Sequence, residues 1–491
     1  MAEFPNYLVR IRVVPLLSLS LKYWSYQNKC DKGLEKERDK PLGYVSTVKK
    51  STAPSGGWSD LWKQEDYWAM WLGLTIVLLA IAFWSIGNNF MNWIVLKIPN
   101  YSDYRTAISY ISSHKSAILA LYLFFLILFS IAVKVLTGEV QRYLVGFTFL
   151  FSMSILVSMW GSWDVMKRYN FETPLLALVV GLVISNFLKI PYWLSTALQT
   201  QFYVKTGIVL MGASLPFTLI VQAGSTAFAQ ATIISLATFL TIYWTGTRVF
   251  ALDKRFAATL AAGGSICGVS ASIAIGGTVK AEKQHVSIAI SLVILWSIVM
   301  IFILPLSIKA LNILPGPAGA WIGTAEFADA PGMAAAAAIN EQAIKTFTLM
   351  KVVGRDMFIG IWCFIMALTS ITRWDKRYVG TNPNALDIWI RFPKFVLGFI
   401  VASIIITILA ASANGVTSKA IDNNILNPIS ELRNWTFIFT FLSIGLSSRL
   451  KELASVGWKP FAAFTAGVLI NIPLGYLLSV VIMGNYWITI K

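Results

Sequence analysis

The chain has 491 residues, of which 56% are hydrophobic and only 13% are charged, whereas about 25% of the residues in an average soluble domain are charged. This composition excludes an ordinary soluble protein and indicates an all-α polytopic membrane protein. The net charge of +17 does not indicate nucleic-acid binding, because Lys and Arg gather in short loops between apolar runs, which is the pattern that orients membrane proteins. The three cysteines and two histidines are scattered along the chain, which argues against a disulfide framework, a metal site or a cofactor.

Residues 1–67 precede the first apolar run of spanning length and mix basic with acidic side chains. We expect them to form a cytosolic N-terminal arm. The apolar stretch at 13–21 is too short to cross a bilayer, and the small residues of a signal-peptide cleavage site do not follow it. A position along the membrane surface would suit this stretch.

Thirteen apolar runs of spanning length, or close to it, follow the arm. They predict about 11–13 transmembrane helices. We divide them into an N-terminal transmembrane extension at 68–173 and a transporter domain at 174–491. The runs are 68–86, 117–137, 143–161, 174–188, 203–221, 226–246, 257–276, 285–304, 319–340, 352–372, 395–412, 433–447 and 460–484.

The basic loops predict the orientation of the chain. If every run crosses the membrane, the loops richest in Lys and Arg all lie on the side of the N-terminus: 247–256, 373–394 and 448–459. The loops 222–225 and 413–432 on the other side carry a single basic residue, Lys419. Because basic loops stay in the cytosol, we expect the N-terminus inside and the C-terminus outside.

Two stretches of the chain resemble each other and suggest a duplicated architecture. Gly212-Ala-Ser and Gly445-Leu-Ser are each followed, twelve residues after the glycine, by another glycine, Gly224 or Gly457. In the predicted topology the two stretches run in opposite directions, as expected of an inverted repeat. Chance similarity between apolar helices is the alternative, because their amino-acid alphabet is narrow.

The run at 261–277 reads A-A-G-G-S-I-C-G-V-S-A-S-I-A-I-G-G and contains five glycines. Each glycine weakens a helix by about 1 kcal/mol, and at membrane depth the freed backbone groups need protein, water or a ligand as partners. Broken helices of this kind form the substrate sites of secondary transporters, whereas small residues can also serve only to pack helices closely. The run predicts a substrate site formed by Gly263, Gly264, Ser265, Gly268 and Ser270.

A second broken region lies at 321–332, where Pro331 and glycines interrupt a helix. Glu326 and Asp329 are three residues apart and share a face where the backbone is helical. Carboxylates at membrane depth are candidates for a coupling-cation or proton site, although a solvated loop at the membrane edge would also explain them. If 257–276 and 319–340 both crossed the membrane they would run in the same direction, so either one of them re-enters or they are not a repeat pair.

Lys351 and Arg355 are four residues apart and share a helical face. Beside a site at mid-membrane they would suit an anion, and at a helix end they would instead extend to the lipid interface. Three further lysines near segment ends are predicted to be interface anchors: Lys205, Lys280 and Lys283.

Four stretches resemble the YeiH-type family of bacterial membrane proteins, whose members carry the label of sulfate exporters. They are A-A-G-G-S-I-C-G-V-S-A at 261–271, T-G-I-V-L-M-G-A-S-L at 206–215, V-K-A-E at 279–282 and G-L-S-S-R-L-K-E-L-A-S-V-G-W-K-P at 445–460. The resemblance covers roughly 174–484. It implies a fold related to bile-acid symporters and cation/proton antiporters, with a panel domain and a core domain that holds crossed, broken helices.

The chain departs from the family pattern in two places. Shorter members tend to carry a His-acid-Val-Ala-Gln pattern where this sequence has E-F-A-D-A-P-G, and they place a Lys and an Arg three apart where Lys351 and Arg355 are four apart. Both departures fall on candidate site residues. They leave the substrate and the coupling ion open.

The sequence therefore predicts a secondary active transporter of a small anion, with sulfate or a related sulfur oxyanion implied by the resemblance alone. We expect coupling to H⁺ or Na⁺, a multi-pass location in the bacterial inner membrane, and no nucleic-acid partner; a homodimer is one option for its assembly. No ATP-binding motif of the form G-x-x-x-x-G-K-[ST] occurs.

Two other functions are alternatives to anion transport. A cation/proton antiporter would use Glu326 and Asp329. An intramembrane enzyme would use Ser265 or Cys267 as nucleophile, but only His285 could serve as a nearby base and no HExxH motif occurs. Packing is therefore the expected role of Cys267, and we do not expect an enzyme.

Overall fold

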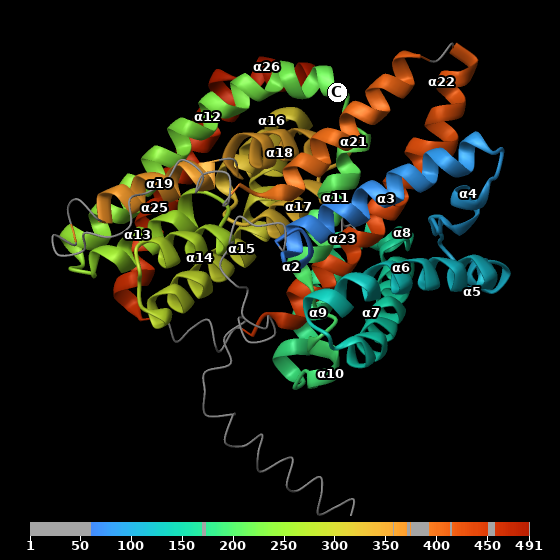
Figure 1. Ribbon diagram of the computed structural model, residues 1–491, viewed down its shortest axis with the longest axis horizontal. Helices are drawn as coiled ribbons and strands as arrows, with labels where there is room; N and C mark the ends of the chain where they lie inside the picture. Colours follow the sequence, from blue (N-terminus) through green and yellow to red (C-terminus); the bar gives the residue numbers. More distant parts are fainter. Residues whose placement is uncertain are drawn as a thin grey trace, which may run out of the picture. The chain divides into compact units, whose positions relative to one another are not determined.

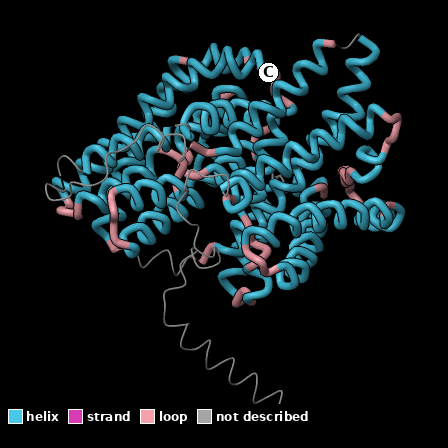
Figure 2. The backbone as a smooth tube through the Cα atoms, viewed as in Figure 1, coloured by secondary structure: helices cyan, strands magenta, loops and turns pink. Residues whose placement is uncertain are grey.

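The computed structural model describes residues 60–168, 173–356, 358–370, 374, 392–412, 415–449 and 457–490. The predictions for residues 1–59, and for most of the 373–394 loop, lie outside the described residues. Every regular element in the described ranges is a helix, and the one β contact there is an isolated bridge between Tyr101 and Trp163 (Figure 2).

Eight of the described helices are long and apolar enough to cross a membrane, so the protein is an all-α, multi-pass membrane protein, as predicted. They correspond to α3 (Glu65–Ser85), α6 (Lys115–Leu136), α7 (Val140–Gly161), α12 (Phe217–Trp244) with its π-helical extension η1 (Thr245–Val249), α15 (Lys283–Ala310), the continuous run from α18 (Glu341–Thr348) through η2 (Leu349–Asp356) to α19 (Phe358–Thr369), α21 (Lys394–Ala411), and α25 (Trp458–Tyr476) with η5 (Leu477–Ile482).

The helices pack as two groups, which we call the panel and the core. The panel consists of α3, α6, α7, α9 (Thr173–Phe187), α11 (Thr200–Ala213), α21 and α23 (Asn427–Ser447), with the short helices α4 (Phe90–Ile94), α5 (Tyr104–Ser113) and α10 (Tyr192–Ser195). The core consists of α12, α13 (Lys254–Ser265), α14 (Val269–Thr278), α15, α16 (Pro315–Ala325), α17 (Asp329–Ala337), α18 to α19, α25 and α26 (Gly484–Thr489). Figure 1 shows core helices α12 to α15 on the left and panel helices α3, α6, α7 and α10 on the right.

Few elements join the panel to the core. Contacts between the groups run chiefly from α17 to α9, α11 and α23, and from α12 to α21. The helices α3 and α7, from the predicted N-terminal extension, pack on α9, α11 and α23 and so belong to the panel.

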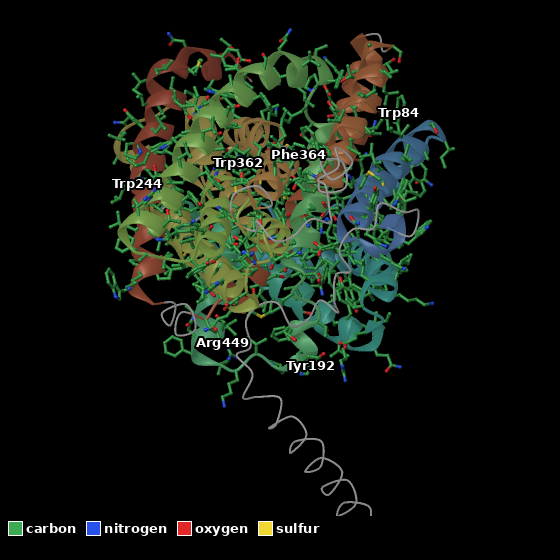
Figure 3. All side chains as sticks on the ribbon, turned by 60° about the vertical axis from the view of Figure 1, so that its left-hand side comes forward. Trp84, Tyr192, Trp244, Trp362, Phe364 and Arg449 are labelled. Atoms are coloured by element: carbon green, nitrogen blue, oxygen red, sulfur yellow. The ribbon has the colours of Figure 1, made fainter. Side chains whose placement is uncertain are left out.

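Bulky aromatic side chains such as Trp84, Tyr192 and Trp244 project from the periphery (Figure 3).

The run at 257–276 is not a span but a re-entrant hairpin. α13 and α14 lie side by side and antiparallel, because a Cβ atom on Gly263 would lie 2.5 Å from Ser272 Oγ and one on Gly276 would lie 3.3 Å from Thr259 Cγ2. The helices have 12 and 10 residues, so each reaches only about 15–18 Å, half of a bilayer core of about 30 Å. The tip of this hairpin therefore lies near mid-membrane.

The run at 319–340 is a second re-entrant hairpin. Gly319 packs on the backbone of Ala343 and Gly323 packs on Met350, so α16 and α18 run parallel. They can do so only because α17, which lies between them in the chain, runs back toward the start of α16. α15 crosses between the two hairpins, so they enter from opposite sides. The question of direction raised by the sequence is thus resolved, because both runs re-enter.

The two matched stretches around Gly212 and Gly445 occupy comparable places. Each begins at the end of a panel helix, α11 or α23, and continues into a core helix, α12 or α25. α11 packs on α23, and α12 packs on α25. This placement is compatible with a duplicated pair, and the inverted repeat stays a prediction.

Candidate functional site

The tip of the first hairpin lies at Ile266–Gly268. α13 starts at the N-cap Asp253, whose side chain accepts hydrogen bonds from two backbone N–H groups, and it ends at the C-cap Ile266. Gly268 then adopts φ +68°, a conformation that side chains disfavour. A Cβ atom there would lie 2.8 Å from Phe327 O, so the glycine is also required by the close approach of the second hairpin.

The tip of the second hairpin lies at Glu326–Ala328. Glu326 is the C-cap of α16, and its Oε1 accepts hydrogen bonds from the backbone N–H of Phe327 (3.0 Å) and of Ala328 (3.4 Å). The carboxylate thereby replaces part of the helical bonding that the break removes. Asp329 opens α17 and is 5% exposed. The alternative of a solvated loop at the membrane edge is therefore wrong, because both carboxylates are buried.

Lys351 fastens the two tips together. Its Nζ donates to Ile266 O at 2.9 Å, Glu326 O at 3.0 Å and Phe327 O at 3.0 Å, so all three of its protons have acceptors. The side chain is fully buried. The alternative position at the lipid interface is therefore excluded for Lys351.

Arg355 makes the matching set of contacts one turn further along. Its NH1 donates to the carbonyls of Gly323, Thr324 and Glu326, at 3.1, 2.6 and 3.0 Å, and its Nε donates to Ser265 O at 3.3 Å. Both cations therefore satisfy carbonyl groups at the C-terminal ends of α13 and α16. NH2 is the guanidinium nitrogen that has no hydrogen-bond partner among the described residues.

Asp356 is a site residue that sequence reasoning missed. It lies in the π-helix η2, whose i→i+5 bonding widens the turn, so that residues five apart such as Lys351 and Asp356 come to lie on one face. α-Helical spacing would have turned Asp356 away. The side chain is 1% exposed, and neither of its oxygens has a partner among the described residues.

Several buried polar atoms without a hydrogen-bond partner lie on the helices that carry or contact the tips. In the described part of the chain these include Ser265 Oγ, Ser272 Oγ, Asp329 Oδ1, Arg355 NH2 and both carboxylate oxygens of Asp356. Buried polar groups are ordinarily paired, so such a cluster is a reservoir of unused donors and acceptors. It is the chemistry expected of a site that binds ions or small polar ligands.

The predicted substrate residues divide into two sets. Gly268 and Ser265 lie at the tip itself, and Ser270 lies in the first turn of α14, half-buried. Gly263 packs against Ser272 and Gly264 packs against Ile242 and Phe464. These last two glycines therefore allow close helix packing, which was the alternative explanation for the small residues.

Lys205 is not the interface anchor that was predicted. It is 8% exposed and forms ion pairs with Glu65 at 3.2 Å and Asp66 at 2.8 Å, which join α11 to α3 inside the panel. Glu65 is 140 residues away in sequence, so spacing alone could not reveal the partners.

Among the described residues, no three His, Cys, Asp or Glu side chains are close enough together to hold a metal ion.

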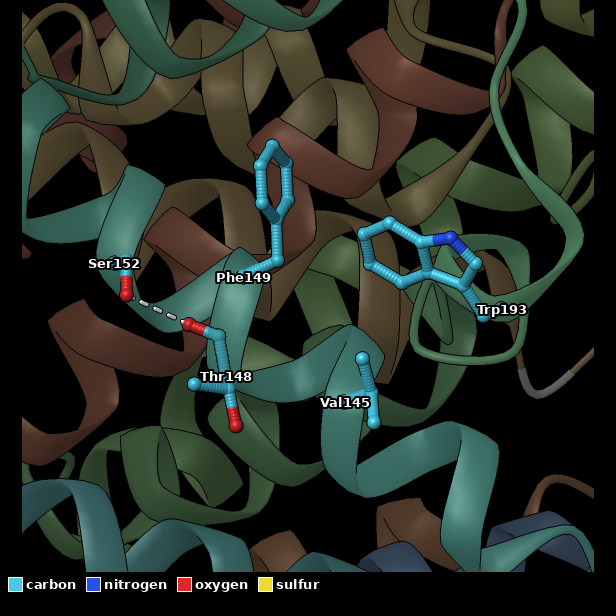
Figure 4. Close-up of a pocket in the computed structure, with 5 residues that line it drawn as sticks. All are labelled: Val145, Thr148, Phe149, Ser152 and Trp193. Carbon is cyan, nitrogen blue, oxygen red and sulfur yellow. Dashed lines mark hydrogen bonds between the residues drawn. The ribbon is translucent and has the colours of Figure 1, made fainter. Parts of the chain in front are cut away.

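An open groove of about 450 Å³ lies apart from the hairpins, between α7 and α10 (Figure 4). Its lining is mainly apolar: Phe149 and Trp193 pack edge to face, with ring centres 5.8 Å apart, and Ser152 is bonded to the backbone of its own helix at Thr148. The groove has none of the charged groups found at the tips.

Comparison with known proteins identifies one matching family and several related membrane proteins. The sequence model of the family Conserved hypothetical protein 698 matches residues 145–464. A UPF0324 membrane protein of Rhodopirellula baltica is 32% identical over 373 residues, which are 75% of this chain and 68% of the relative. A UPF0324 membrane protein of Nitratidesulfovibrio vulgaris is 30% identical over 351 residues, 70% of this chain and 60% of the relative. The UPF0324 inner membrane protein YeiH of Escherichia coli K12 is 26% identical over 311 residues, 62% of this chain and 84% of the relative. No solved structure is significantly similar.

Proposed function

The chain belongs to the Conserved hypothetical protein 698 family, whose relatives are named membrane proteins, and on that premise we propose that it is a secondary active transporter of a small anion. The proposal rests chiefly on one observation, the meeting of the tips of two hairpins that enter from opposite ends of α15. In a bilayer, helices of this length would place the tips near mid-membrane. Irregular backbone at that depth is tolerated only where protein buries it or where it borders an aqueous cavity. In transporters such breaks are where substrates and coupling ions bind.

Helix polarity at the tips favours an anion. Lys351 and Arg355 bind the carbonyl ends of α13 and α16, which are the negative ends of those half-helices. The N-terminal end of α14 carries a partial positive charge, and its N-cap Gly268 has no side chain to satisfy it. Ser270 in the next turn adds a hydroxyl donor. An oxyanion placed here would meet backbone N–H groups and a hydroxyl.

The carboxylates supply the coupling. Glu326, Asp329 and Asp356 are all buried, and Asp329 and Asp356 each have an oxygen without a partner among the described residues. A proton or Na⁺ bound there would offset the negative charge of an anion at α14. Coupling to H⁺ or Na⁺ follows from that balance of charge.

The division into panel and core supplies a route for movement. The tips lie in the core, and α17 is the hairpin helix that reaches the panel. Sliding of the core along the panel would expose the tips alternately to the two sides. We place the protein in the inner membrane, since the Escherichia coli relative is named an inner membrane protein. As the transported anion we propose sulfate or a related sulfur oxyanion, on the basis of the resemblance to YeiH-type proteins.

A cation/proton antiporter is the second candidate. It is favoured by the three buried carboxylates, because the protons of the nearby Lys351 and Arg355 are largely taken by backbone carbonyls. In that case the tips would carry a cation alone.

Uptake into proteoliposomes separates the two candidates. Labelled sulfate, sulfite, small sulfonates and bicarbonate are offered with and without Na⁺ and pH gradients, and ²²Na⁺ exchange is followed in parallel. Anion uptake that is abolished by Gly268→Leu supports the anion transporter. Na⁺/H⁺ exchange without uptake of any anion would instead identify the antiporter.

A further inference from the structure

A second charged site lies where the panel and the core meet, away from the hairpin tips. Arg433 of α23 forms a two-pronged ion pair with Glu341, the first residue of α18, through NH1–Oε1 at 3.0 Å and NH2–Oε2 at 2.9 Å. Arg433 belongs to the panel and Glu341 to the core. The pair therefore ties together two groups that otherwise touch through few elements.

The guanidinium is built into the panel. Arg433 is 1% exposed, and its Cζ lies 6.0 Å from the centre of the Phe437 ring. Its NH1 also contacts Ser214 Oγ at 3.4 Å, and its NH2 contacts Ser430 Oγ at 2.9 Å. Its Nε has no hydrogen-bond partner among the described residues. NH1 also lies 3.3 Å from Met211 Sδ and NH2 3.2 Å from Asn434 Oδ1. The fork is therefore held rigidly, and Nε is the donor left over.

The Glu341 carboxylate, which accepts two hydrogen bonds from Arg433, is not buried. The Glu341 side chain is 47% exposed, in contrast to the buried arginine. Water therefore reaches the pair from the carboxylate side. A dissolved anion can take the place of the carboxylate without crossing the interior of the protein.

We propose that Arg433 is a capture site for a small oxyanion, and that the Glu341 carboxylate occupies it as an internal stand-in. A carboxylate presents two oxygens to an arginine fork in the same manner as sulfate, a sulfonate or a free carboxylic acid. When such an anion displaces Glu341, the ion pair between core and panel breaks. This inference rests on the proposed transport of an anion, because it makes arrival of the substrate the event that frees the core to move.

The start of α18 strengthens the site. Glu341 lies in the first turn of that helix, where N–H groups and the helix dipole favour negative charge. Once the carboxylate is removed, an anion on Arg433 inherits this environment. Loss of Glu341 should therefore improve anion binding, which is the opposite of what a purely structural ion pair would do.

The test titrates potassium sulfate and potassium acetate into the full-length protein in lipid nanodiscs by calorimetry, with ionic strength held constant by KCl. The variants are Glu341→Gln, Arg433→Gln and Arg433→Lys. Glu139→Gln is the matched control, because it removes the carboxylate of an ion pair that lies wholly within the panel, with Arg142 at 3.4 Å. Repeating the titrations in a Gly268→Leu background separates this site from the hairpin tips.

We expect Glu341→Gln to bind sulfate or acetate about tenfold or more tightly than the wild type, if the pair is closed more than about 90% of the time. Arg433→Gln should weaken binding by about tenfold or more. Arg433→Lys should fall between, since lysine keeps the charge and loses the fork, so the site is tested even if the Gln variant folds poorly. Glu139→Gln should match the wild type.

Equal or weaker binding by Glu341→Gln would overturn the capture site and leave a structural ion pair. If that result is accompanied by anion uptake that Gly268→Leu still abolishes, the transporter proposal stands without this site. If neither site binds an anion and no anion is taken up, both proposals fail together. The two failures are therefore distinguishable.

Discussion

Replacement of Lys351 by methionine tests whether this side chain holds the two hairpin tips together. The substitution leaves an unbranched side chain one heavy atom shorter and removes three hydrogen bonds to buried carbonyls, those of Ile266, Glu326 and Phe327. Each carbonyl left without a partner costs about 1–3 kcal/mol, so the gross loss is about 3–9 kcal/mol. Burying an ammonium group costs several kcal/mol, which the variant recovers. We therefore expect a net destabilisation of about 3 kcal/mol, at the lower end of the range.

The assay is thermal unfolding of the purified protein in detergent, followed by hydrogen exchange of the tips. At about 2 °C per kcal/mol for a large chain, Lys351→Met should lower the midpoint by roughly 6 °C. Exchange should accelerate at the tips and not in the panel. Lys345→Met is the control, because Lys345 precedes Lys351 in the same continuous helical run and is only half-buried. If the two variants were equally stable, Lys351 would not be the side chain that holds the tips together.

Three further predictions concern transport and topology. Gly268→Leu should abolish anion uptake by protein that is inserted in proteoliposomes, because Gly268 has a φ of +68° and lies close to Phe327 O. Gly277→Leu is the control and should retain uptake in the same assay, because the space around Gly277 is open. Arg355→Gln should weaken anion binding, measured by calorimetry, about ten- to hundredfold. Glu326→Gln should leave the anion affinity measurable and remove its dependence on pH or Na⁺. Unchanged affinity in Arg355→Gln would count against a role of Arg355 in anion binding. A cysteine placed in the loop 247–256 should react only with a reagent applied from the cytosolic side, and labelling solely from outside would reverse the topology.

The predicted orientation is compatible with the two hairpins. A hairpin returns to the side from which it entered, so each predicted span that becomes a hairpin removes one crossing. Two such changes remove two crossings, and the loops after both hairpins therefore stay on the predicted side. The basic loops at 247–256 and 448–459 remain on the same side as the N-terminus in the predicted scheme. The topology therefore stays a prediction that rests on the loop charges and not on the number of spans.

Glycine and proline content predicted the two broken regions, but not the exact breaks: at the second hairpin the break is at Glu326–Ala328, and Pro331, which was predicted to interrupt the helix, lies within α17. Nor did composition predict how the chain continues after each break. The run at 261–277 has about the length of a single span, and two antiparallel half-helices of 12 and 10 residues use a similar number of apolar residues. Hydropathy cannot separate these cases, because it measures length and not direction. The antiparallel contact between Gly263 and Ser272 decides it, and that contact is tertiary.

Sequence spacing identified a pair of charged residues in η2 only where α- and π-helices bring the same residues to one face. Lys351 and Arg355 were recognised because they are four residues apart, which is a spacing shared by α- and π-helices. Asp356 was missed because only the wider π turn brings it beside them. Arg433 and Glu341 are 92 residues apart and meet through the packing of panel on core. No local pattern marks such a pair.

The two buried cations also explain why each hairpin tip is asymmetric. A break in a helix exposes a carbonyl end and an N–H end together, and an ion can be attracted to either. Lys351 and Arg355 satisfy the carbonyl ends of both breaks, so these ends are closed to a cation from solution. At the second break Asp329 already places negative charge in the first turn of α17. The N-terminal end of α14 at Gly268 is then the helix end whose partial charge has no side-chain counterpart at its cap. If the protein transports an anion, as we propose, this end of α14 is where the anion would bind, because a partial positive charge attracts it.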